Sequence, residues 1–459
     1  MQNLMIGLDG NNFFTILILR FRRDKRFFMP ELQKGWVIQV KGGTSCRILS
    51  ELGRGGQGIV YKVKFNDKDY ALKWYTKSCS DAFYNNLEKN VNAGAPNKGF
   101  LWPLAITEKK EGCFGYIMDL RPSGYEDMSK FILAKARFAS VDAQLNACLR
   151  IVKAFLDLHR IGYSYQDLND GNFFIHPKTG DVLICDNDNI APHGQNLGIL
   201  GKAGFMAPEI VEGVGRPDTY SDYYSLAVCL FILIYMNRPF EGKKYLSCPC
   251  DNDPKYAKEL FGFNSVFIMD PTNRVNAPDE HIHKNVLRRW GIYPKQLQDA
   301  FCRTFSSEAI KNKQKRISDR EWKDILLQVR STLSQCPSCK NKTFIDPTDM
   351  GKKCVFCKKA IPAYSFLEIG KFKIPLMAGQ NLFSCITFGA NNTFDEVVGT
   401  VVERNGQVGL LNQSSTPWTV TCTNREDRLL APKSSMPARQ GYVIRFGNQG
   451  GSGEIKIAK

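Results

Sequence analysis

The sequence predicts a multidomain chain: an α+β domain, then a short four-cysteine segment, then a small all-β sandwich. Three observations support this organisation. Strand-like runs and then helical patterns fill residues 29–332, two Cys-x-x-Cys pairs follow, and short strands separated by turns fill residues 364–459. The length of 459 residues suits roughly two to four domains, and 43% apolar residues suffice for sizeable cores.

The first 28 residues differ in composition from the rest of the chain. A mostly apolar run, Phe13–Leu19, is followed by five basic residues between Arg20 and Arg26. A signal peptide carries its positive charge before the apolar run, and seven residues cannot span a bilayer. We interpret residues 1–28 as a non-native or disordered extension, with translation starting at Met29. A basic peripheral membrane arm is the alternative.

The α+β domain opens with a strand-like run at 36–41 and then a glycine-rich turn. The pattern G-x-G-x-x-G-x-V lies between strand-like runs at 46–52 and 59–65, at Gly53, Gly55, Gly58 and Val60. Glycines let the backbone approach phosphates because no Cβ intervenes. A dinucleotide-binding turn would open a helix, whereas here a strand follows.

Two further features complete the first part of the α+β domain: a lysine at the end of one strand-like run, and a second run that ends in polar residues. Lys73 closes the strand-like run 70–73, and Glu88 is the only glutamate between Lys73 and Glu108. Glu88 lies on a stretch that we predict as the next helix, so it is the expected ion-pair partner of Lys73. Residues 114–121 form an apolar strand that ends in polar residues.

Acidic and amide side chains gather in a loop and hairpin between residues 163 and 190. Asp167 is followed five residues later by Asn172, and Asp186 and Asp188 follow the second apolar strand of the hairpin. Hard oxygen ligands of this kind suit Mg²⁺, which keeps waters and phosphates as its other ligands. An amphipathic helix is predicted over 142–159, beneath this loop.

These motifs, in this order, resemble the eukaryotic-type protein kinases, and Met206-Ala-Pro-Glu209 matches the end of their activation segment. The resemblance covers residues from about 46 to 332. It implies a two-lobed protein kinase fold over residues 29–332, with an N-lobe to about 118 and a C-lobe from about 122. It also implies ATP as the phosphoryl donor and Mg²⁺ as the metal.

The resemblance assigns a role to each motif. Lys73 and Glu88 would position the phosphates, Asp167 would accept the proton of the acceptor hydroxyl, and Met118 would lie behind the adenine. Magnesium would be held by Asn172 and Asp186, with Asp188 as a further contact. The implied ATP-binding residues are Gly53, Gly55, Gly58, Val60, Lys73, Asp119, Leu120 and Arg121.

Structural roles follow from the same resemblance. Residues 225–236 are apolar on every side, which predicts a buried core helix, and Asp222 just before it would fix the catalytic-loop backbone. Arg316 would pair with Glu209. Ser318 is predicted to open the last helix, with Glu321 completing a capping box. We interpret residues 242–276 as an irregular insertion.

Four cysteines predict a zinc ribbon over residues 333–360. The pairs Cys336/Cys339 and Cys354/Cys357 are fourteen residues apart, and two such turns supply four thiolates in a tetrahedron. Because four thiolates leave no open position, the zinc would be structural. Free thiols and redox-active pairs are the alternatives. The other cysteines are scattered and no secretory signal precedes them, so we expect a cytoplasmic protein.

Residues 364–459 predict a β-sandwich, with Asn405-Gly406 as a hairpin turn. Residues 410–415 and 444–447 are similar to forkhead-associated domains, which bind phosphothreonine. The Ser-x-x-His and Asn-Gly-Thr signatures of that family are missing, so the prediction is a protein-interaction sandwich. The net charge of +17 is dispersed, as on an ordinary soluble surface; a nucleic-acid partner is the less favoured alternative.

The chain departs from the kinase pattern at three places. The catalytic-loop His-Arg-Asp reads Tyr165-Gln166-Asp167, Asn169 replaces a lysine, and Asp-Phe-Gly reads Asp186-Asn187-Asp188. Without that lysine, positive charge must come from Lys73, metal or elsewhere. With the cysteines and the β-domain, this pattern resembles bacterial kinases associated with von Willebrand factor A proteins and metal-dependent phosphatases in tellurite-resistance-type stress systems, which implies such partners.

We therefore predict an ATP-dependent, Mg²⁺-dependent protein kinase acting on Ser or Thr of a protein substrate. The alternatives are a pseudokinase scaffold that binds nucleotide and acts through its zinc ribbon and β-domain, and a small-molecule phosphotransferase. Gln166 cannot read a phosphate as an arginine does, and residues 187–209 contain no Ser, Thr or Tyr. We therefore expect activity without phosphorylation of this segment.

Overall fold

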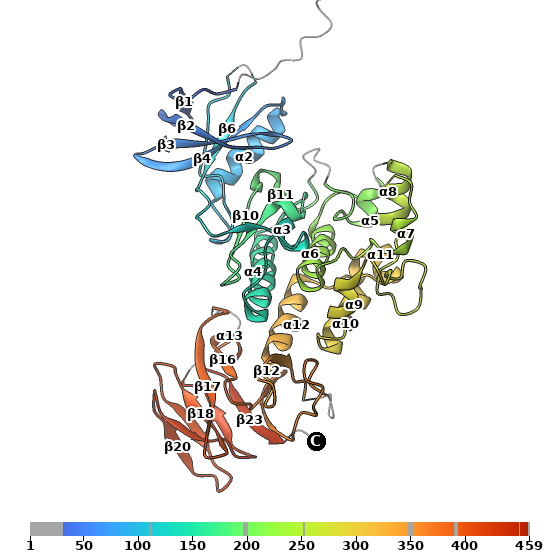
Figure 1. The fold of residues 1–459 in the computed structure, drawn as a ribbon. Helices are drawn as coiled ribbons and strands as arrows, with labels where there is room; N and C mark the ends of the chain where they lie inside the picture. The colour runs from blue at the N-terminus through green and yellow to red at the C-terminus, as the bar shows by residue number, and fades with distance from the viewer. Residues whose placement is uncertain are drawn as a thin grey trace, which may run out of the picture. The chain divides into compact units, whose positions relative to one another are not determined.

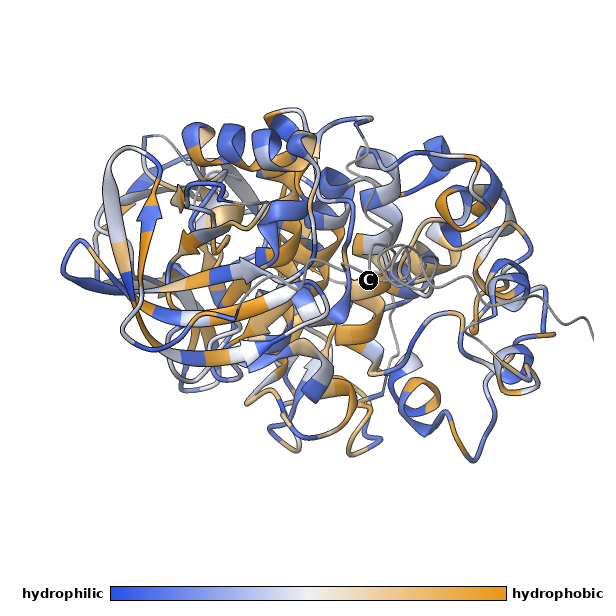
Figure 2. Ribbon diagram, turned by 90° about the horizontal axis from the view of Figure 1, so that it is seen from above, coloured by the Kyte–Doolittle hydropathy of each residue, from blue (hydrophilic) through white to orange (hydrophobic). Residues whose placement is uncertain are grey.

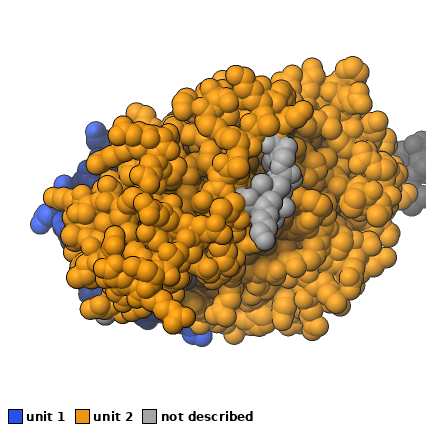
Figure 3. Space-filling view, turned by 90° about the horizontal axis from the view of Figure 1, so that it is seen from below, with its two compact units in different colours: residues 1–95, 101–120 blue, residues 96–100, 121–459 orange. Residues whose placement is uncertain are grey.

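A computed structural model describes residues 31–110, 112–195, 201–250, 253–347, 353–389, 393–448 and 450–457 (Figure 1). The expected extension over residues 1–28 lies outside these ranges. The chain forms two compact units: the first comprises Met1–Ala95 and Leu101–Leu120, and the second Pro96–Phe100 and Arg121–Lys459 (Figure 3). Within the described residues, no helix combines the length and apolar character needed to cross a membrane.

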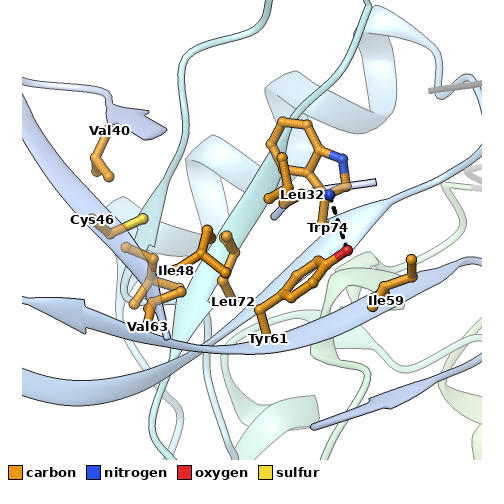
Figure 4. Packing of buried hydrophobic residues seen from close by; sticks show 10 residues of the cluster. Leu32, Val40, Cys46, Ile48, Ile59, Tyr61, Val63, Leu72 and Trp74 are labelled. Atoms are coloured by element: carbon orange, nitrogen blue, oxygen red, sulfur yellow. Dashed lines mark hydrogen bonds between the residues drawn. The ribbon is translucent and has the colours of Figure 1, made fainter. Parts of the chain in front are cut away.

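The first unit is built on a six-stranded antiparallel sheet with the order β1-β2-β3-β4-β6-β5. Its strands are β1 Val37–Val40, β2 Thr44–Arg54, β3 Gly58–Phe65, β4 Lys68–Tyr75, β5 Ala105–Ile106 and β6 Gly115–Met118. Apolar side chains from one face form a core that includes Ile48, Tyr61, Val63 and Leu72 (Figure 4). The Tyr61 hydroxyl also accepts a hydrogen bond from Leu32 N at 3.1 Å.

Helix α2, Asp81–Ala93, packs in the same unit. Ser80 caps its N-terminus by accepting from Phe83 N, as serine commonly does at this position. Phe83 lies 5.4 Å from Tyr75, ring centroid to centroid, and Phe114 lies 4.9 Å from Tyr75. The buried side of α2 also carries Asn86 and Asn90, so polar residues of this helix lie on its inward face as well as on its exposed face.

The core of the second unit begins with α4, Val141–Arg160, and α6, Thr219–Tyr235. Helix α4 is amphipathic, as predicted, and α6 is buried almost throughout, which its apolar sequence requires. Helix α6 starts earlier than predicted because Asp218 and Ser221 form a capping box, so Asp222 lies inside its first turn. Blue and orange segments along the helical ribbons in Figure 2 show the mixture of polar and apolar residues.

Short strands and turns carry the predicted catalytic loop. Strand β8 pairs with β11, and β9 lies between β10 and β7. The elements are β7 Glu126–Asp127, α3 Met128–Ile132, β8 Tyr163–Ser164, η1 Asp170–Asn172, β9 Phe173–Ile175, β10 Val182–Ile184, η2 Asn187–Asn189 and β11 Ala191–Pro192.

The remaining helices of this part lie between residues 208 and 331. They are α5 Pro208–Val211, α7 Lys243–Leu246, α8 Pro254–Phe261, α9 Lys284–Trp290, α10 Lys295–Thr304, α11 Ser307–Lys311, η3 Lys313–Lys315 and α12 Asp319–Ser331. The prediction of an irregular insertion at 242–276 was wrong in part, because α7 and α8 form there. Asp253 caps α8 and Pro254 occupies its first turn. Ser318 caps α12 as expected, accepting from Glu321 N at 3.2 Å, but the predicted capping box is not completed, because the Glu321 carboxylate pairs with Arg303.

The four-cysteine segment begins with a hairpin, β12 Leu333–Gln335 with β13 Lys342–Phe344. It packs within the second unit: Phe344 lies 5.1 Å from Tyr293, ring centroid to centroid, and Lys342 forms an ion pair with Asp142 at 2.5 Å.

The last part consists of two antiparallel sheets with the orders β15-β14-β23-β22-β19-β20 and β16-β17-β18-β21. Trp418 is fully buried in the core and contacts Phe446 at 4.9 Å, ring centroid to centroid. The elements are β14 Ser365–Ile369, β15 Phe372–Pro375, β16 Asn381–Phe383, α13 Ser384–Thr387, β17 Val397–Arg404, β18 Gln407–Asn412, β19 Trp418–Thr421, β20 Asp427–Leu430, β21 Ser435–Pro437, β22 Val443–Arg445 and β23 Ser452–Ile457.

Candidate active site

In the first unit, the glycine-rich turn joins β2 to β3. Gly53 pairs with Val60 across the two strands, and Gly55 N donates to Gly58 O at 2.9 Å. A Cβ on Gly58 would lie 2.2 Å from Trp74 O, so the close approach of β4 requires glycine there. A Cβ on Gly53 would meet open space. Packing therefore does not require glycine at position 53, and the absence of a side chain there leaves the backbone of the turn exposed.

Lys73 lies on β4, in the same unit, and its side chain is buried. Its Nζ donates to Gln57 Oε1 of the glycine-rich turn at 3.3 Å and lies 5.7 Å and 6.0 Å from the rings of Tyr75 and Tyr116. Glu88, the expected partner of Lys73, instead forms an ion pair with Lys41. The reason is its position on α2: Glu88 points outward, whereas Asn86 and Asn90 occupy the buried face.

The predicted adenine-binding segment follows β6. Met118 is buried and pairs with Ala71 across the sheet. Asp119 and Arg121 are exposed, and the boundary between the two units falls between Leu120 and Arg121. In the second unit, the Arg121 guanidinium stacks 4.2 Å from the ring centre of Phe174.

Asp167 lies in the second unit, in the predicted catalytic loop, and two amides contact its carboxylate. Asn169 Nδ2 donates to Asp167 Oδ1 at 3.2 Å, and Asn189 Nδ2 makes a longer contact of 3.5 Å with Oδ2. Asn172 Nδ2 donates to the Asp167 carbonyl oxygen at 2.9 Å. Neutral donors therefore orient Asp167 from both sides of its carboxylate.

The Tyr165 side chain, fully buried, links the turn that ends at Asn172 to the segment that precedes Asp186. Its hydroxyl donates to the carbonyl oxygen of Cys185, which precedes Asp186, and accepts from Asn172 Nδ2 at 3.1 Å. Cys185 N donates to Asn172 O at 2.9 Å. Because Asn172 uses Nδ2 for both of its bonds, Oδ1 is the atom with which it would bind a cation. Burial raises the pKa of the Tyr165 hydroxyl well above its ordinary value, so it remains a donor.

Asp186 adopts the left-handed backbone conformation, with φ 55° and ψ 40°. This conformation is uncommon for a residue with a side chain and costs of order 1 kcal/mol, and such residues cluster at functional sites. The following turn is fixed by Asn187 Nδ2, which donates to Ile184 O at 2.9 Å. Asp188 is completely buried within this turn.

A buried histidine holds the loop from below. His159 on α4 contacts Asp222 through Nε2 at 3.0 Å and Asp319 through Nδ1 at 2.7 Å. Asp222 Oδ2 also accepts from Tyr165 N at 2.7 Å, which confirms the expected role of Asp222 in fixing the loop backbone. Burial opposes protonation of His159, but hydrogen bonds to the two aspartates outweigh it and raise its pKa to about 9.

Two cations meet at Asp170, whose side chain is buried within the catalytic loop. Lys202 Nζ lies 3.2 Å from Asp170 Oδ1 and Arg238 Nη2 lies 2.9 Å from Oδ2. Both cations also lie over the ring of Phe205, at 5.4 Å and 5.6 Å from its centre. We call Asp170, Lys202, Phe205 and Arg238 the Asp170 cluster.

Hydrogen bonds join the predicted activation segment to the predicted catalytic loop at Gln166 and to helix α6 at Thr219. Gln166 has a left-handed backbone with φ 71°, and its Nε2 donates to the Gln195 carbonyl oxygen at 2.5 Å. His193 Nδ1 contacts Thr219 Oγ1 at 2.9 Å. At the other end of the segment, Arg316 forms the expected bidentate ion pair with Glu209, at 2.8 Å and 2.6 Å.

The four predicted zinc ligands come together, with their sulfur atoms all within 4.8 Å of one another. Two equivalent turns present them. Cys336 N donates to Asn341 O and Cys354 N to Lys359 O, each at 2.9 Å. The residue after each second cysteine, Lys340 and Lys358, has φ 61°. Four thiol sulfurs in this arrangement fit a tetrahedral zinc site.

Sequence reasoning missed the Tyr165 hydroxyl, Asn189 and the Asp170 cluster. An acidic residue between Asp167 and Asn172 was a visible signal for Asp170. Its partners Lys202 and Arg238 lie 32 and 68 residues away, so no local spacing could reveal them.

Comparisons with known proteins agree with this geometry. Residues 46–252 match the protein kinase domain family. Beta-adrenergic receptor kinase 1 of Mesocricetus auratus is 26% identical over 206 residues, covering 42% of this chain and 29% of that protein. Ribosomal protein S6 kinase alpha-6 of Danio rerio is 25% identical over 281 residues, covering 55% and 37%. The chain therefore carries a protein kinase domain, and its matches span well under half the length of these two relatives.

Proposed function

We propose that the protein is an ATP-dependent kinase that transfers the γ-phosphoryl group to Ser or Thr hydroxyls of a protein substrate. The observation that carries this proposal is the arrangement of the catalytic loop. Asp167 is oriented by Asn169 and Asn172, and Tyr165 joins Asn172 to the residue before Asp186. A loop with a purely structural role would not need this arrangement of side chains.

Asp167 would orient the acceptor hydroxyl and accept its proton while the phosphorus–oxygen bond to that hydroxyl forms and the bond to ADP breaks. Asn172 Oδ1 and the Asp186 carboxylate are hard oxygen donors that fit magnesium, and Asp188 is the further candidate. Bound magnesium would neutralise phosphate charge. The left-handed backbone of Asp186 and the Tyr165 bridge hold these donors in place without it.

Most of the residues proposed to bind the nucleotide belong to the first unit. The open glycine turn at Gly53 and Gly55 suits contact between backbone N–H groups and phosphate oxygens. Lys73, buried beside that turn, would pair with the phosphates. Backbone groups of Asp119, Leu120 and Arg121 are the proposed contacts for adenine. In this unit Glu88 forms an ion pair with Lys41, and Gln57 contacts Lys73.

A second candidate is a pseudokinase that binds nucleotide without transferring phosphate. Two observations favour it: Glu88 pairs with Lys41, and Asn169 stands where a lysine is expected. The presence of both candidate magnesium ligands, Asn172 and Asp186, and of the proton acceptor Asp167 favours the enzyme. The small-molecule phosphotransferase is the third candidate, and it differs from the first only in its acceptor.

The deciding experiment incubates the purified chain with γ-labelled ATP, magnesium and a generic protein acceptor. Wild type is compared with Asp167→Ala and with a control, Asp299→Asn, which alters an exposed aspartate on α10. We expect wild type and control to transfer phosphate and Asp167→Ala to lose transfer while still binding ATP. Equal ATP binding without transfer in all three proteins would establish the pseudokinase instead, and transfer to small hydroxyl compounds alone would establish the phosphotransferase.

We further propose that activity does not require phosphorylation of the activation segment. Gln166, in the place of a phosphate-reading arginine, contacts the segment directly at Gln195, and Arg316 anchors its end through Glu209. Protein treated with a phosphatase and then freed of it should keep its activity. Loss of activity that returns with a phosphate mapped to this segment or its neighbours would contradict the proposal.

The remaining assignments are predictions that rest on sequence and geometry. The four cysteines would hold one structural zinc, and the C-terminal sandwich would contact other proteins. A von Willebrand factor A protein and a metal-dependent phosphatase are the partners implied by the family resemblance, in a cytoplasmic stress response.

A further inference from the structure

The proposed reaction needs positive charge on the acceptor side, and the catalytic loop lacks its usual source. Asn169 contacts the Asp167 carboxylate at 3.2 Å, so a lysine at this position would lie beside the acceptor hydroxyl. An asparagine supplies a hydrogen-bond donor but no charge. Charge developing on the transferred phosphoryl group is stabilised mainly by fixed cations and dipoles, so a cation placed nearby would compensate.

The backbone of Lys202 follows a glycine that lies close to Asp167. Its neighbour Gly201 lies against the catalytic aspartate, because a Cβ on Gly201 would be 3.3 Å from Asp167 Oδ1 and 3.1 Å from Met206 Cγ. The Lys202 ammonium then lies 3.2 Å from Asp170, three residues beyond Asp167. Its side chain is 50% exposed, whereas the Asp170 side chain is only 8% exposed. Lys202 is therefore an accessible cation held at the catalytic loop.

The Asp170 cluster allows Lys202 to leave its ion pair at little cost. A buried carboxylate without a partner is strongly unfavourable, but Arg238 stays on Asp170 at 2.9 Å, and Glu241 contacts Arg238 at 3.2 Å. An ion pair with a half-exposed lysine, such as that of Lys202, contributes little to stability. The second cation thus keeps Asp170 neutralised when Lys202 turns toward an anionic group.

We propose that Lys202 is a catalytic residue that supplies the positive charge absent at Asn169, by contacting the phosphoryl group as it moves from ATP to the acceptor. This inference rests on the proposed kinase function. In the step, the bond from phosphorus to the ADP oxygen breaks, the bond to the acceptor oxygen forms, and Asp167 takes the hydroxyl proton. Lys202 stays protonated and forms no covalent bond.

The test measures kcat and KM for Lys202→Ala, with Lys202→Met as a second variant that keeps the aliphatic stem. We expect kcat to fall about 100-fold, the magnitude seen when one charge-stabilising group is removed, with the KM for ATP nearly unchanged. The double variant Asn169→Lys/Lys202→Ala moves the cation to the empty position and should recover at least about tenfold of that loss. Lys255→Ala, on the exposed side of α8, is the matched control and should behave as wild type.

A purely structural role for Lys202 makes a different prediction. If Lys202 only neutralised Asp170, then Asp170→Asn/Lys202→Ala would restore kcat, whereas we expect this double variant to stay as impaired as Lys202→Ala. Melting temperature and nucleotide binding establish that each variant is folded. Wild-type kcat in both Lys202 variants, restoration by Asp170→Asn, or no gain from Asn169→Lys would overturn the inference alone. A wild-type protein without transfer would instead overturn the proposed function on which it rests.

Discussion

Tyr165 shows how one buried hydroxyl can connect two separate segments of a site. It accepts from Asn172 and donates to the carbonyl oxygen of Cys185, while its own N–H is held by Asp222. The two segments that present Asn172 and Asp186 are thereby joined. The protein kinases that the sequence resembles usually have a histidine at this position. Here the longer tyrosine side chain places a hydroxyl where it hydrogen-bonds to two partners.

The first prediction concerns this hydroxyl. Tyr165→Phe removes it without changing the ring, so Asn172 loses one anchor and a buried carbonyl loses its donor, at a cost of about 1–3 kcal/mol. We expect weaker phosphoryl transfer and a higher magnesium requirement, measured by titrating magnesium at fixed ATP. Tyr125→Phe, which removes a hydroxyl bonded to Asp181, is the control and should leave the magnesium requirement unchanged.

His159 gives a second prediction, in the pH dependence of stability. Its pKa is raised to about 9 in the folded state, against about 6.5 when unfolded. The stabilisation is therefore complete below pH 6.5 and is lost as the pH rises toward 9, by about 3 kcal/mol in total. Urea unfolding at a series of pH values should show this fall in wild type.

The comparison variant for that experiment is His159→Gln, which cannot gain a proton. Its unfolding free energy should be lower at neutral pH and should change less between pH 6.5 and 9. His281→Gln, at an exposed position, should retain the wild-type slope. An unchanged slope in His159→Gln would show that other groups cause the pH dependence.

At the scale of elements, backbone turns and not helices position the chemistry. The two cysteine turns have matching hydrogen bonds, and both place a lysine at φ 61°. The catalytic turn likewise depends on left-handed residues at Gln166 and Asp186. Such conformations are costly for residues with side chains and persist only where the surroundings enforce them.

A third prediction follows for the cysteine turns. Purified protein should contain about one zinc per chain, and Cys336→Ser should lose it, because three thiolates bind zinc less well than four. Hydrogen exchange should then increase over residues 333–347 and 353–360, and ATP binding should persist. Cys250→Ser, an exposed cysteine outside this set, is the control. Metal analysis that finds no zinc in freshly purified wild type would refute the assignment.

At the scale of the whole molecule, Arg330 joins helices α4 and α12 to the C-terminal sandwich within the second unit. This residue on α12 is 1% exposed and donates to Asn146 Oδ1 at 2.9 Å and to the Phe394 carbonyl oxygen at 2.5 Å. Its guanidinium also stacks 4.0 Å from the ring centre of Phe383. Burial lowers its pKa, which reflects the cost of placing a cation there. Arg150 adds an ion pair to Asp395 at 2.9 Å.

The fourth prediction is that Arg330 makes these parts unfold together. Arg330→Ala should lower the unfolding free energy by about 3 kcal/mol, because it leaves a cavity and unpaired acceptors. Calorimetry should then resolve separate transitions for the helical part and the sandwich, whereas we expect wild type to show one transition for the second unit. Arg439→Ala, at an exposed position, should leave the transition intact. A single transition in Arg330→Ala would mean that other contacts maintain the coupling.

The sequence by itself determined the identity and order of the chemical groups. The glycine turn, Lys73, Asp167, Asn172 and Asp186 were recognisable because each belongs to a short motif in which spacing reflects local backbone geometry. The same holds for the four cysteines, since two local turns suffice to present them. Strands and helices followed from apolar periodicity, with errors where the short helices α7 and α8 formed within 242–276.

Only the tertiary structure decided which side chains meet. Glu88 turned out to face Lys41, because the inward face of α2 is set by how that helix packs and not by which glutamate is nearest in sequence. Lys202, Arg238 and Asp170 are brought together over 32 and 68 residues, and Arg330 reaches Phe394 over 64. Local propensity carries no information about such pairings, because long-range packing of helices and strands selects them.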